Sequence, residues 1–403
     1  MTELLKQHLI DPEICIRCYT CEEMCPVGAI THDEVNVVVE ASKCNHCMAC
    51  ISPCPTGSID NWRVVASPYS LEEQLAWTEL PKQEDFGAGS SGAKANSNGS
   101  AIEALDDAIA ALLAEAHRGA GGREKAPASA SKPSVNLYTL RNPLEAIVQG
   151  NYRLTAENAD SDVRHIILDL GSARFPVLEG QSIGIIAPGV DSNGKPHLPR
   201  LYSVSSPRDG ERPNTNNLAL TVKREPAGIC SNYVCNLKKG DKVRITGPFG
   251  ATFLMPEDPQ AKLIMVCTGT GSAPFRAFTM RRQRVLPDTK GSLLLFFGAR
   301  TADSLPYFGP LAKVPEDFMA KHFAFSRMPG QPKVYVQDKL REARQAIGSL
   351  LNQSNTYIYV CGLKEMETGV EAAFADIADS AGLDWHSIRS SMRENGRYHI
   401  ETY

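Results

Sequence analysis

Cysteines gather near the start of the chain, in two runs with the same spacing. Eight of the twelve cysteines lie between residues 15 and 54. Each run reads C-x2-C-x2-C-x3-C-P, and the runs are Cys15, Cys18, Cys21 and Cys25, then Cys44, Cys47, Cys50 and Cys54. Thiolates are soft metal ligands, and this spacing is typical of bacterial proteins that hold two [4Fe-4S] clusters. The runs therefore predict two iron–sulfur clusters.

The fourth cysteine of each run is expected to bind the other cluster. One cluster would then be held by Cys15, Cys18, Cys21 and Cys54, and the second by Cys44, Cys47, Cys50 and Cys25. Structural zinc is the main alternative, but zinc normally uses two C-x2-C knuckles rather than three successive thiols that end in Cys-Pro. Disulfides are a weaker alternative, because "MTELLKQHLI" lacks the apolar core of a secretion signal.

Three further motifs suit nucleotide cofactors. "RLYSVSSP" at 200–207 offers a cation for phosphate, a flat ring for stacking and a hydroxyl for a ring nitrogen, which suits a flavin, although alone it could be an ordinary strand. "GICSN" at 228–232 offers small residues and backbone N–H groups for a pyrophosphate. "CTGTGSAPFRAF" follows an apolar strand and opens a helix, where a dinucleotide phosphate would bind, but it is not a strict G-x-G-x-x-G.

The first 65 residues resemble the bacterial ferredoxins with two [4Fe-4S] clusters, including "VGAI" and "TGSI" after the Cys-Pro pairs. This segment holds nine acidic and four basic residues, a formal charge of −5, while the whole chain carries −4. An acidic surface can guide docking to a basic partner or domain, or it can be only a solvated surface.

Residues 144 to 403 resemble the plant-type ferredoxin–NADP reductases. Six motifs carry the resemblance in order: "FPVLEGQSIG", "RLYS", "GICSN", "TGTGSAPFR", "SR…KVYVQ" and "CGL", closed by the terminal "ETY". The resemblance implies FAD contacts at Arg200, Leu201, Tyr202, Ser203, Val222, Lys223, Ile229, Cys230 and Ser231. Arg200 would bind phosphate, Tyr202 would stack on the flavin, and Ser203 would hydrogen-bond its edge. The family usually has a longer loop before "GICSN", where this chain has only "EPA", so the adenine end of FAD is expected to be held differently.

The same resemblance assigns the nicotinamide side. NADP contacts are implied at Thr270, Arg276, Ala299, Arg300, Ser326, Arg327, Lys333, Tyr335, Gln337, Gly362 and Leu363. The residues from Ser326 to Gln337 would bind the 2′-phosphate, which predicts NADPH rather than NADH as the electron donor. Ser203, Cys361 and Glu401 would be catalytic residues beside the reacting rings, and Tyr403 would cover the flavin until the nicotinamide displaces it.

The pattern of strands and helices predicts a multidomain protein. An α+β ferredoxin-like domain with two clusters is expected over 1–65. Short β-type segments broken by Gly and Pro predict an antiparallel β-barrel that binds FAD over 142–258. Apolar strands that alternate with helices predict an α/β domain with a parallel sheet, which binds NADP, over 259–403.

An Ala/Gly/Ser-rich linker is expected over residues 66–141. Within it, Ile102, Leu105, Ile109, Leu112 and Leu113 have helical spacing. This pattern predicts one amphipathic helix, which could dock on a neighbouring domain or remain loosely tethered.

Composition excludes several classes of partner. The net charge of −4 gives no broad basic surface for nucleic acid. Apolar runs such as "SLLLFFGA" are too short to cross a bilayer, so no membrane partner is expected. We expect a cytoplasmic protein.

The motifs together predict an oxidoreductase in which NADPH reduces FAD and two [4Fe-4S] clusters carry the electrons onward. A free-standing ferredoxin–NADP reductase and an electron-transfer module of a larger redox complex are the alternatives.

At whole-chain level, the order of domains resembles the reductase components of benzoyl-CoA epoxidases, also called benzoyl-CoA oxygenases, of aerobic benzoate degradation. That resemblance implies a monooxygenase reductase component that serves a separate di-iron oxygenase. The chain itself has no Glu-x-x-His pair for a di-iron centre and no haem Cys motif.

Overall fold

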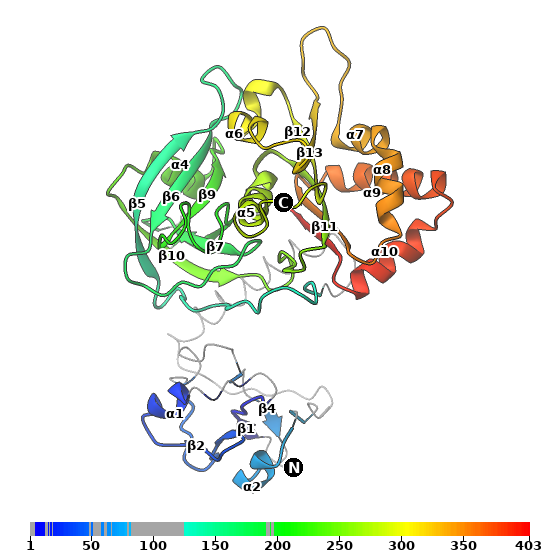
Figure 1. Ribbon diagram of the computed structural model, residues 1–403. Coiled ribbons are helices and arrows are strands. Elements are labelled where there is room, and N and C mark those ends of the chain that lie inside the picture. Colours follow the sequence, from blue (N-terminus) through cyan, green and yellow to red (C-terminus); the bar gives the residue numbers. More distant parts are fainter. Residues whose placement is uncertain are drawn as a thin grey trace. The chain divides into compact units, whose positions relative to one another are not determined.

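The chain divides into two compact units, residues 1–97 and 98–403. The computed structural model describes residues 5–12, 15, 17, 19–47, 50, 58–59, 63–65, 67–78, 80–81, 125–190, 194 and 197–403 (Figure 1). Cys18, Cys54 and the helix predicted around residues 102–113 lie outside these residues. None of the helices in the described part is long and apolar enough to span a membrane.

The described residues of the first unit form two short antiparallel strand pairs and two short helices. Strand β1 (Leu5–Gln7) pairs with β4 (Arg63–Val65), and β2 (Ile30–His32) pairs with β3 (Val37–Val39). The helices are α1 (Thr20–Glu23) and α2 (Leu71–Leu75). The core combines aliphatic side chains with thiols, and its buried members are Ile10, Cys21, Ile30, Val37, Val39, Cys50 and Ile59.

Helix α2 belongs to this first unit because polar side chains fix it there. Ser70 and Glu73 form a capping box at its start. The buried Gln74 side chain accepts from Val39 N at 3.1 Å and donates to Val39 O at 2.9 Å. Asn36 Nδ2 donates to the carbonyl of Leu75 at 2.9 Å. The unit therefore extends beyond residue 65, where the sequence placed its end. Sequence pattern alone does not reveal this helix, because it is short and has no apolar periodicity.

The second unit begins with a six-stranded antiparallel sheet in the order β8-β7-β10-β5-β6-β9. The strands are β5 (Leu144–Arg153), β6 (Val163–Asp169), β7 (Ser182–Ile186), β8 (Arg200–Ser203), β9 (Asn217–Lys223) and β10 (Lys242–Phe249). A bridge between Val204 and Leu220 joins the two edges and closes the sheet into a barrel. Helix α4 (Ile229–Asn236) follows β9. The predicted FAD-type barrel is confirmed in its architecture.

A five-stranded parallel sheet follows, in the order β13-β12-β11-β14-β15. Its strands are β11 (Lys262–Thr268), β12 (Leu293–Ala299), β13 (Met319–Phe325), β14 (Thr356–Gly362) and β15 (Tyr398–Thr402). The helices around it are α5 (Ser272–Val285), α6 (Phe308–Ala312), α7 (Val336–Glu342), α8 (Arg344–Leu351), α9 (Met366–Ser380) and α10 (Trp385–Glu394). Short 3-10 turns are η2 (Gly269–Gly271) and η3 (Ala302–Ser304). The predicted α/β domain is confirmed.

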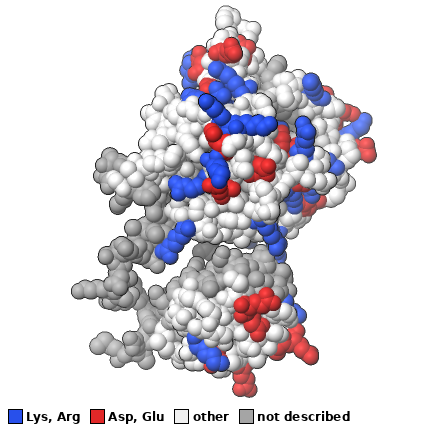
Figure 2. Space-filling model, turned by 90° about the vertical axis from the view of Figure 1, so that its left-hand side faces the viewer, with Lys and Arg blue, Asp and Glu red and all other residues white. Residues whose placement is uncertain are grey.

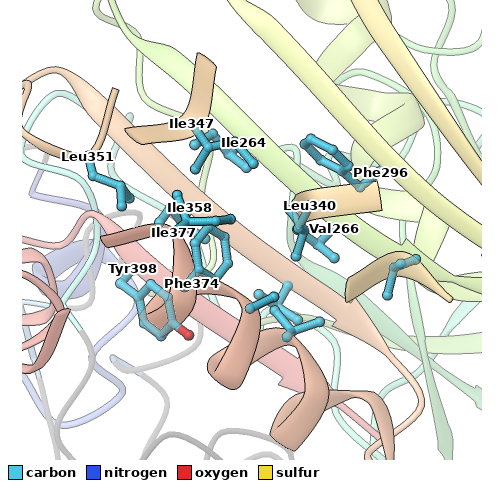
Figure 3. Close-up of a cluster of buried hydrophobic side chains, with 14 of the residues drawn as sticks. Ile264, Val266, Phe296, Leu340, Ile347, Leu351, Ile358, Phe374, Ile377 and Tyr398 are labelled. Atoms are coloured by element: carbon cyan, nitrogen blue, oxygen red, sulfur yellow. The ribbon is translucent and has the colours of Figure 1, made fainter. Parts of the chain in front are cut away.

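Both faces of the parallel sheet are buried, which explains its continuous apolar strands. On one face, Ile264 and Val266 of β11 pack with Phe374 of α9 and Leu340 of α7 (Figure 3). On the other face, Met265 packs in a second cluster with side chains of α5. Alternate residues of β11 therefore serve opposite layers.

Residues 125–139 run along both domains of the second unit. Asp258 N donates to Ser129 Oγ at 3.3 Å on the sheet-domain side. Gln181 Nε2 donates to Ser134 O at 3.0 Å, and Tyr138 pairs with Gly247 of the barrel. The last part of the expected linker is therefore packed on the reductase unit rather than free of it.

Candidate functional site

A cavity of about 830 Å³ lies where the barrel meets the carboxyl edge of the parallel sheet. This volume is within the usual range for cofactor sites. The cavity lining contains many of the residues that the sequence assigned to FAD and to the reacting rings: Arg200, Leu201, Tyr202, Ser203, Lys223, Ile229, Cys230, Ser231, Thr270, Cys361, Glu401 and Tyr403. The structure thus brings together residues that are up to two hundred positions apart in the sequence.

Strand β8 forms the barrel wall of this cavity. It pairs antiparallel with β7, which places Ser203 opposite Ser182 and Tyr202 opposite Ile183. Ser182 Oγ donates to Ser203 Oγ at 3.4 Å. Burial raises the pKa of the Tyr202 phenol, and the neighbouring Cys230 adds to this shift. The wall therefore presents a neutral aromatic ring and an oriented hydroxyl, which is the chemistry that a flavin ring requires.

The start of α4 forms the second side of the cavity. Its first residues, from Gly228 to Ser231, line the cavity, and no side chain caps the helix at Gly228. A Cβ on Gly228 would lie 2.4 Å from Ser231 Oγ, so any other residue here would have to displace the Ser231 side chain. The first backbone N–H groups of a helix lack intrahelical acceptors and favour a phosphate. The donors here fit the diphosphate of a dinucleotide cofactor.

The short "EPA" loop before α4 also borders the cavity. Glu225 and Ala227 are lining residues, and Glu225 Oε1 accepts a hydrogen bond from Lys223 Nζ at 2.6 Å. The sequence marked this loop as different from the family but assigned it no contact. The structure places its acidic side chain beside a predicted FAD residue.

The nicotinamide side is formed where β11 and β14 end. A Cβ on Gly271 would lie 2.1 Å from the Cys361 carbonyl oxygen, so η2 can approach β14 only because of this glycine. Gly362 has a φ of +142°, and Leu363 N donates to Thr268 Oγ1 at 3.1 Å. These contacts leave Cys361 and Thr270 at the cavity wall.

Tyr403 lies at the mouth of the cavity. Its hydroxyl is 2.5 Å from Thr270 Oγ1, and its backbone N donates to Gly362 O at 3.0 Å. The residue as a whole is 60% exposed although its hydroxyl is bonded. Burial raises the pKa of its phenol, so the ring lies against the cavity wall while the rest of the residue faces solvent.

The residues assigned to the 2′-phosphate lie outside the cavity lining, at the edge formed by β12 and β13. Ser326 N donates to Ala299 O at 3.1 Å, and Arg327 N donates to Arg300 O at 2.8 Å. The same edge continues through Lys333 to α7, which begins after Tyr335 and includes Gln337, while Leu363 follows β14 and is 52% exposed. Arg300 and Arg327 both face Asp160 of the barrel, at 3.6 and 3.9 Å.

Val222 and Arg276 are two further predicted cofactor residues that lie outside the cavity lining. Val222 is 1% exposed and packs in the barrel core. Arg276 points away to Glu211 and to the carbonyl of Ser205, at 2.5 and 2.7 Å. A motif can show that an arginine follows a phosphate loop, but not which domain its side chain contacts.

Other lining residues were missed by the sequence reasoning. They are Ser182, Ala187, His197, Leu198, Pro199, Thr221, Ala273 and Thr402. Ser182 lies in the "FPVLEGQSIG" motif, which was a usable signal. Ala273 lies in "TGTGSAPFR" and Thr402 in "ETY", which were also usable signals, whereas the others line the cavity because of tertiary packing.

In the first unit, four thiols border a small cavity. They belong to Cys25, Cys44, Cys47 and Cys50, the set that the exchanged-ligand pattern assigned to one cluster. Ala29 N donates to Cys25 Sγ at 3.2 Å. Burial raises the pKa of Cys50 to about 11, and the neighbouring thiols add to the shift, so a positively charged group is needed to hold this thiolate. Four soft donors around one space fit a [4Fe-4S] cluster.

The other predicted set is only partly described. Cys15 and Cys21 pack with the core of the first unit, while Cys18 and Cys54 lie outside the described residues. Within the described part of the chain, no three His, Cys, Asp or Glu side chains lie close enough together to hold a single metal ion. The thiols around the small cavity thus border a space instead of meeting at one point.

Comparisons with known families agree with this division. The chain matches the oxidoreductase FAD-binding domain over residues 154–253, the oxidoreductase NAD-binding domain over 265–372, and the 4Fe-4S binding domain over 8–31. These matches correspond to the barrel, the parallel-sheet domain and the region of the first cysteine run.

Individual relatives, among them one solved structure, are ferredoxin–NADP reductases. A ferredoxin–NADP reductase of Spirulina sp is 38% identical over 288 residues, which cover 67% of this chain and 98% of that protein. One from Thermosynechococcus vestitus is 38% identical over 325 residues, which cover 75% of this chain and 84% of that protein. The solved ferredoxin–NADP+ reductase of Plasmodium falciparum superposes with a TM-score of 0.53 at 26% identity, over 67% of this chain and 99% of that one. The chain therefore belongs to the ferredoxin–NADP reductase family, as an oxidoreductase with FAD- and NADP(H)-binding domains and a ferredoxin-type 4Fe-4S domain before them.

Proposed function

We propose that this chain takes electrons from NADPH through FAD to two [4Fe-4S] clusters, and delivers them to a separate di-iron oxygenase. One observation supports this proposal most: a nucleotide cavity and a cavity bordered by four thiols occur in the same chain. The Spirulina reductase matches almost over its whole length yet covers only 67% of this chain. The additional electron carrier is thus built into the polypeptide.

The chain's own residues would bind and orient the cofactors. A bound FAD supplies hydride acceptance and release of single electrons, and a [4Fe-4S] cluster supplies single-electron transfer. The N-terminal amides of α4 and the Arg200 guanidinium would hold the FAD phosphates. Tyr202 would pack against the flavin, and the bond from Ser182 would orient the Ser203 hydroxyl. The thiols of Cys25, Cys44, Cys47 and Cys50 would hold one cluster.

NADPH would bind at the carboxyl edge of the parallel sheet. Arg300 and Arg327 offer guanidinium groups to the 2′-phosphate. The end of η2 and the first turn of α5 offer backbone N–H groups to the diphosphate. Tyr403 must leave the cavity mouth so that the nicotinamide can reach the flavin beside Cys361 and Glu401.

The proposed partner is a separate di-iron oxygenase. The order of two-cluster ferredoxin, linker and reductase is that of the reductase components of benzoyl-CoA epoxidases. The sequence lacks Glu-x-x-His pairs and haem Cys motifs, so oxygen activation is assigned to another protein. Benzoyl-CoA 2,3-epoxidation in benzoate degradation is the reaction we propose for that partner.

Reconstitution tests this function. Purified chain, NADPH, oxygen and benzoyl-CoA are incubated with and without a candidate di-iron oxygenase, and the epoxide product is measured. Product is expected only when both proteins are present. Epoxide from this chain alone, or a partner that accepts no electrons from it, contradicts the proposal. Faster reduction of added free ferredoxin than of the chain's own clusters would favour a free-standing ferredoxin–NADP reductase instead.

The cluster count is tested by metal analysis. About eight iron and eight acid-labile sulfide ions per chain are expected for two [4Fe-4S] clusters. Stable zinc in place of iron would refute the iron–sulfur assignment, and about four of each would leave only one cluster.

A further inference from the structure

A group of mostly buried polar side chains, here called the interdomain clamp, joins the barrel to the parallel-sheet domain. It consists of His165, Glu211 and Thr221 from the barrel, with Arg276 and Tyr307 from the sheet domain. His165, Thr221 and Tyr307 are 7%, 4% and 5% exposed. Buried polar groups destabilise a fold unless they are hydrogen-bonded. Burial of these polar groups therefore costs free energy of folding, which the contacts of the clamp must offset.

Tyr307 places its hydroxyl between two side chains of the barrel. The hydroxyl lies 2.9 Å from His165 Nδ1 and 2.6 Å from Thr221 Oγ1. The Tyr307 backbone has a φ of +60°, in the left-handed region that residues other than glycine rarely adopt. Such conformations persist where the surrounding contacts hold them. Two of the contacts that hold this one, to His165 and Thr221, come from the barrel domain.

Arg276 makes the second set of cross-domain bonds. Its guanidinium donates to Ser205 O at 2.7 Å and to the two carboxylate oxygens of Glu211 at 3.0 and 2.5 Å. The guanidinium also lies 5.0 Å from the centre of the Tyr307 ring. Glu211 Oε1 is 3.4 Å from His165 Nε2, which completes a closed circuit of contacts. A bidentate arginine fixes direction as well as distance.

Both ends of the clamp are attached to the cofactor cavity. Thr221 is itself a lining residue, and Ser205 follows β8 by two positions. Arg276 lies on α5, whose Ala273 also lines the cavity and whose start follows Thr270. The clamp thus bonds the wall that would carry the flavin to the helix that would carry the nicotinamide diphosphate.

We propose that Arg276 and Tyr307 are positioning residues that set how the nicotinamide meets the flavin. Neither side chain lines the cavity, and both act through elements that do. Hydride transfer depends on reacting atoms held about 3–3.5 Å apart, and a misplacement of about 1 Å costs up to about 100-fold in rate. The proposal rests on the flavin and NADPH chemistry of the reductase unit and is independent of the clusters and of the oxygenase partner.

Tyr307→Phe is the first test, because it keeps the ring beneath Arg276 and removes only the hydroxyl. In single-turnover experiments with the holoprotein, hydride transfer from NADPH is expected to slow by about tenfold. The long-wavelength charge-transfer absorption between NADPH and the flavin is expected to weaken. The affinity for 2′,5′-ADP, which lacks the nicotinamide, is expected to stay within about twofold.

Tyr398→Phe is the matched control. Tyr398 is 2% exposed, and its hydroxyl donates to Glu371 at 3.0 Å within the sheet domain, so this variant also loses a buried hydrogen bond to a side chain. It is expected to lower the melting temperature without changing hydride transfer or charge-transfer absorption. If Tyr307→Phe shows the same pattern as Tyr398→Phe, the positioning role is overturned.

Two substitutions of Arg276 extend the test. Arg276→Met removes the bonds to Glu211 and Ser205, and we expect it to slow hydride transfer at least as much as Tyr307→Phe. Arg276→Lys keeps a charge opposite Glu211 and is expected to restore part of the rate. Equal rates in both variants and the unmodified chain would contradict the role of Arg276.

Amide hydrogen exchange tests the clamp without any redox step. In the holoprotein without NADPH, exchange along α5 and β6 is expected to be faster in Tyr307→Phe than in Tyr398→Phe. Equal exchange in the two variants counts against the clamp. Hydrogen exchange tests the clamp even if the unmodified chain does not oxidise NADPH. A lack of NADPH oxidation would contradict the proposed function instead of the clamp.

Discussion

Cys361 contributes a neutral thiol to the wall of the nucleotide cavity. Burial raises the pKa of this thiol well above its ordinary value, and the Glu401 carboxylate adds to the shift. Cys361 and Glu401 are direct neighbours in the register of β14 and β15. Because a thiol rather than a thiolate is present at physiological pH, this side chain shapes the site and can donate a weak hydrogen bond, but it does not act as a nucleophile.

Tyr403→Ser is expected to increase the affinity for NADP+ and to reduce the discrimination against NADH. The ring at the cavity mouth must leave before the nicotinamide can enter, so removing it removes a competing occupant. Titration of the oxidised holoprotein with NADP+, and steady-state comparison of NADPH with NADH, measure both effects. Thr270→Val removes only the partner of the Tyr403 hydroxyl and should give a smaller change in the same direction. Unchanged affinities in Tyr403→Ser would mean that the C-terminal residue is merely structural.

Asp160→Asn is expected to tighten NADPH binding by about two- to fivefold, a change that corresponds to the usual size of an exposed ion pair. The Asp160 carboxylate lies 3.6 Å from the Arg300 guanidinium and 3.9 Å from that of Arg327. It therefore pairs with the two cations that would bind the 2′-phosphate and competes with that phosphate. Michaelis constants for NADPH and NADH measure the effect, and the NADH value should not change. Asp317→Asn is the control, because Asp317 pairs with the exposed Lys290. Equal effects on NADPH and NADH would exclude competition with the 2′-phosphate.

Most of the secondary structure follows from local sequence pattern. The apolar residues of β6, among them Ile166 and Leu168 in the barrel core, predict a strand, and the continuous run in β11 predicts a strand buried on both faces. The pattern of residues 338–353, "DKLREARQAIGSLLNQ", predicts one helix, whereas the structure has two helices, α7 and α8, which meet at Ala343. No glycine or proline marks this break, so sequence pattern could not place it.

The contacts that side chains make were harder to predict than the helices and strands that carry them. The residues of "RLYS" and "GICSN" reach the cavity because their strand and helix do, and the elements were identifiable. Arg276 belongs to an equally clear motif, yet it contacts the other domain. The direction of a long side chain depends on a carboxylate that lies 65 positions away in the sequence, and no local pattern contains that information.

Glu211→Gln is expected to remove a part of the stability that depends on pH. Although burial alone would raise the pKa of Glu211, its bonds to His165 and Arg276 lower that pKa to about 2. A carboxyl with a depressed pKa stabilises the fold above its unfolded value, about 4.3, and that contribution disappears as the pH falls towards 2. The lost free energy of unfolding at neutral pH is expected to be on the order of 2 kcal/mol.

Thermal unfolding of the reductase unit, followed by release of flavin fluorescence between pH 2.5 and pH 7, measures this effect. The unmodified chain is expected to lose stability most steeply below pH 4.5, whereas the variant should show a lower and flatter curve there. Parallel curves for the two proteins would mean that Glu211 is not ionised in the clamp.

At the scale of the whole molecule, two units with different chemistry share one chain. Acidic side chains gather on the visible described surface of the first unit, whereas both charges mix on the reductase unit (Figure 2). Each unit has its own core, with thiols in that of the first and apolar layers on both faces of the parallel sheet in the second. Separate cores allow one unit to lose its cofactor while the other stays folded.

Cys44→Ser is expected to impair cluster content while NADPH still reduces the flavin at close to the unmodified rate. Cys44 is one of four thiols around the small cavity of the first unit, whereas the described lining of the nucleotide cavity consists of residues between 182 and 403. Iron content should fall from about eight towards four per chain, and electron delivery to a partner should fall with it. Stopped-flow absorbance at the flavin band and iron analysis are the measurements. Cys235→Ser is the matched control, because Cys235 is a buried thiol of the barrel outside both runs, and it should keep full iron content. Loss of flavin reduction in Cys44→Ser would show that the two units depend on one another.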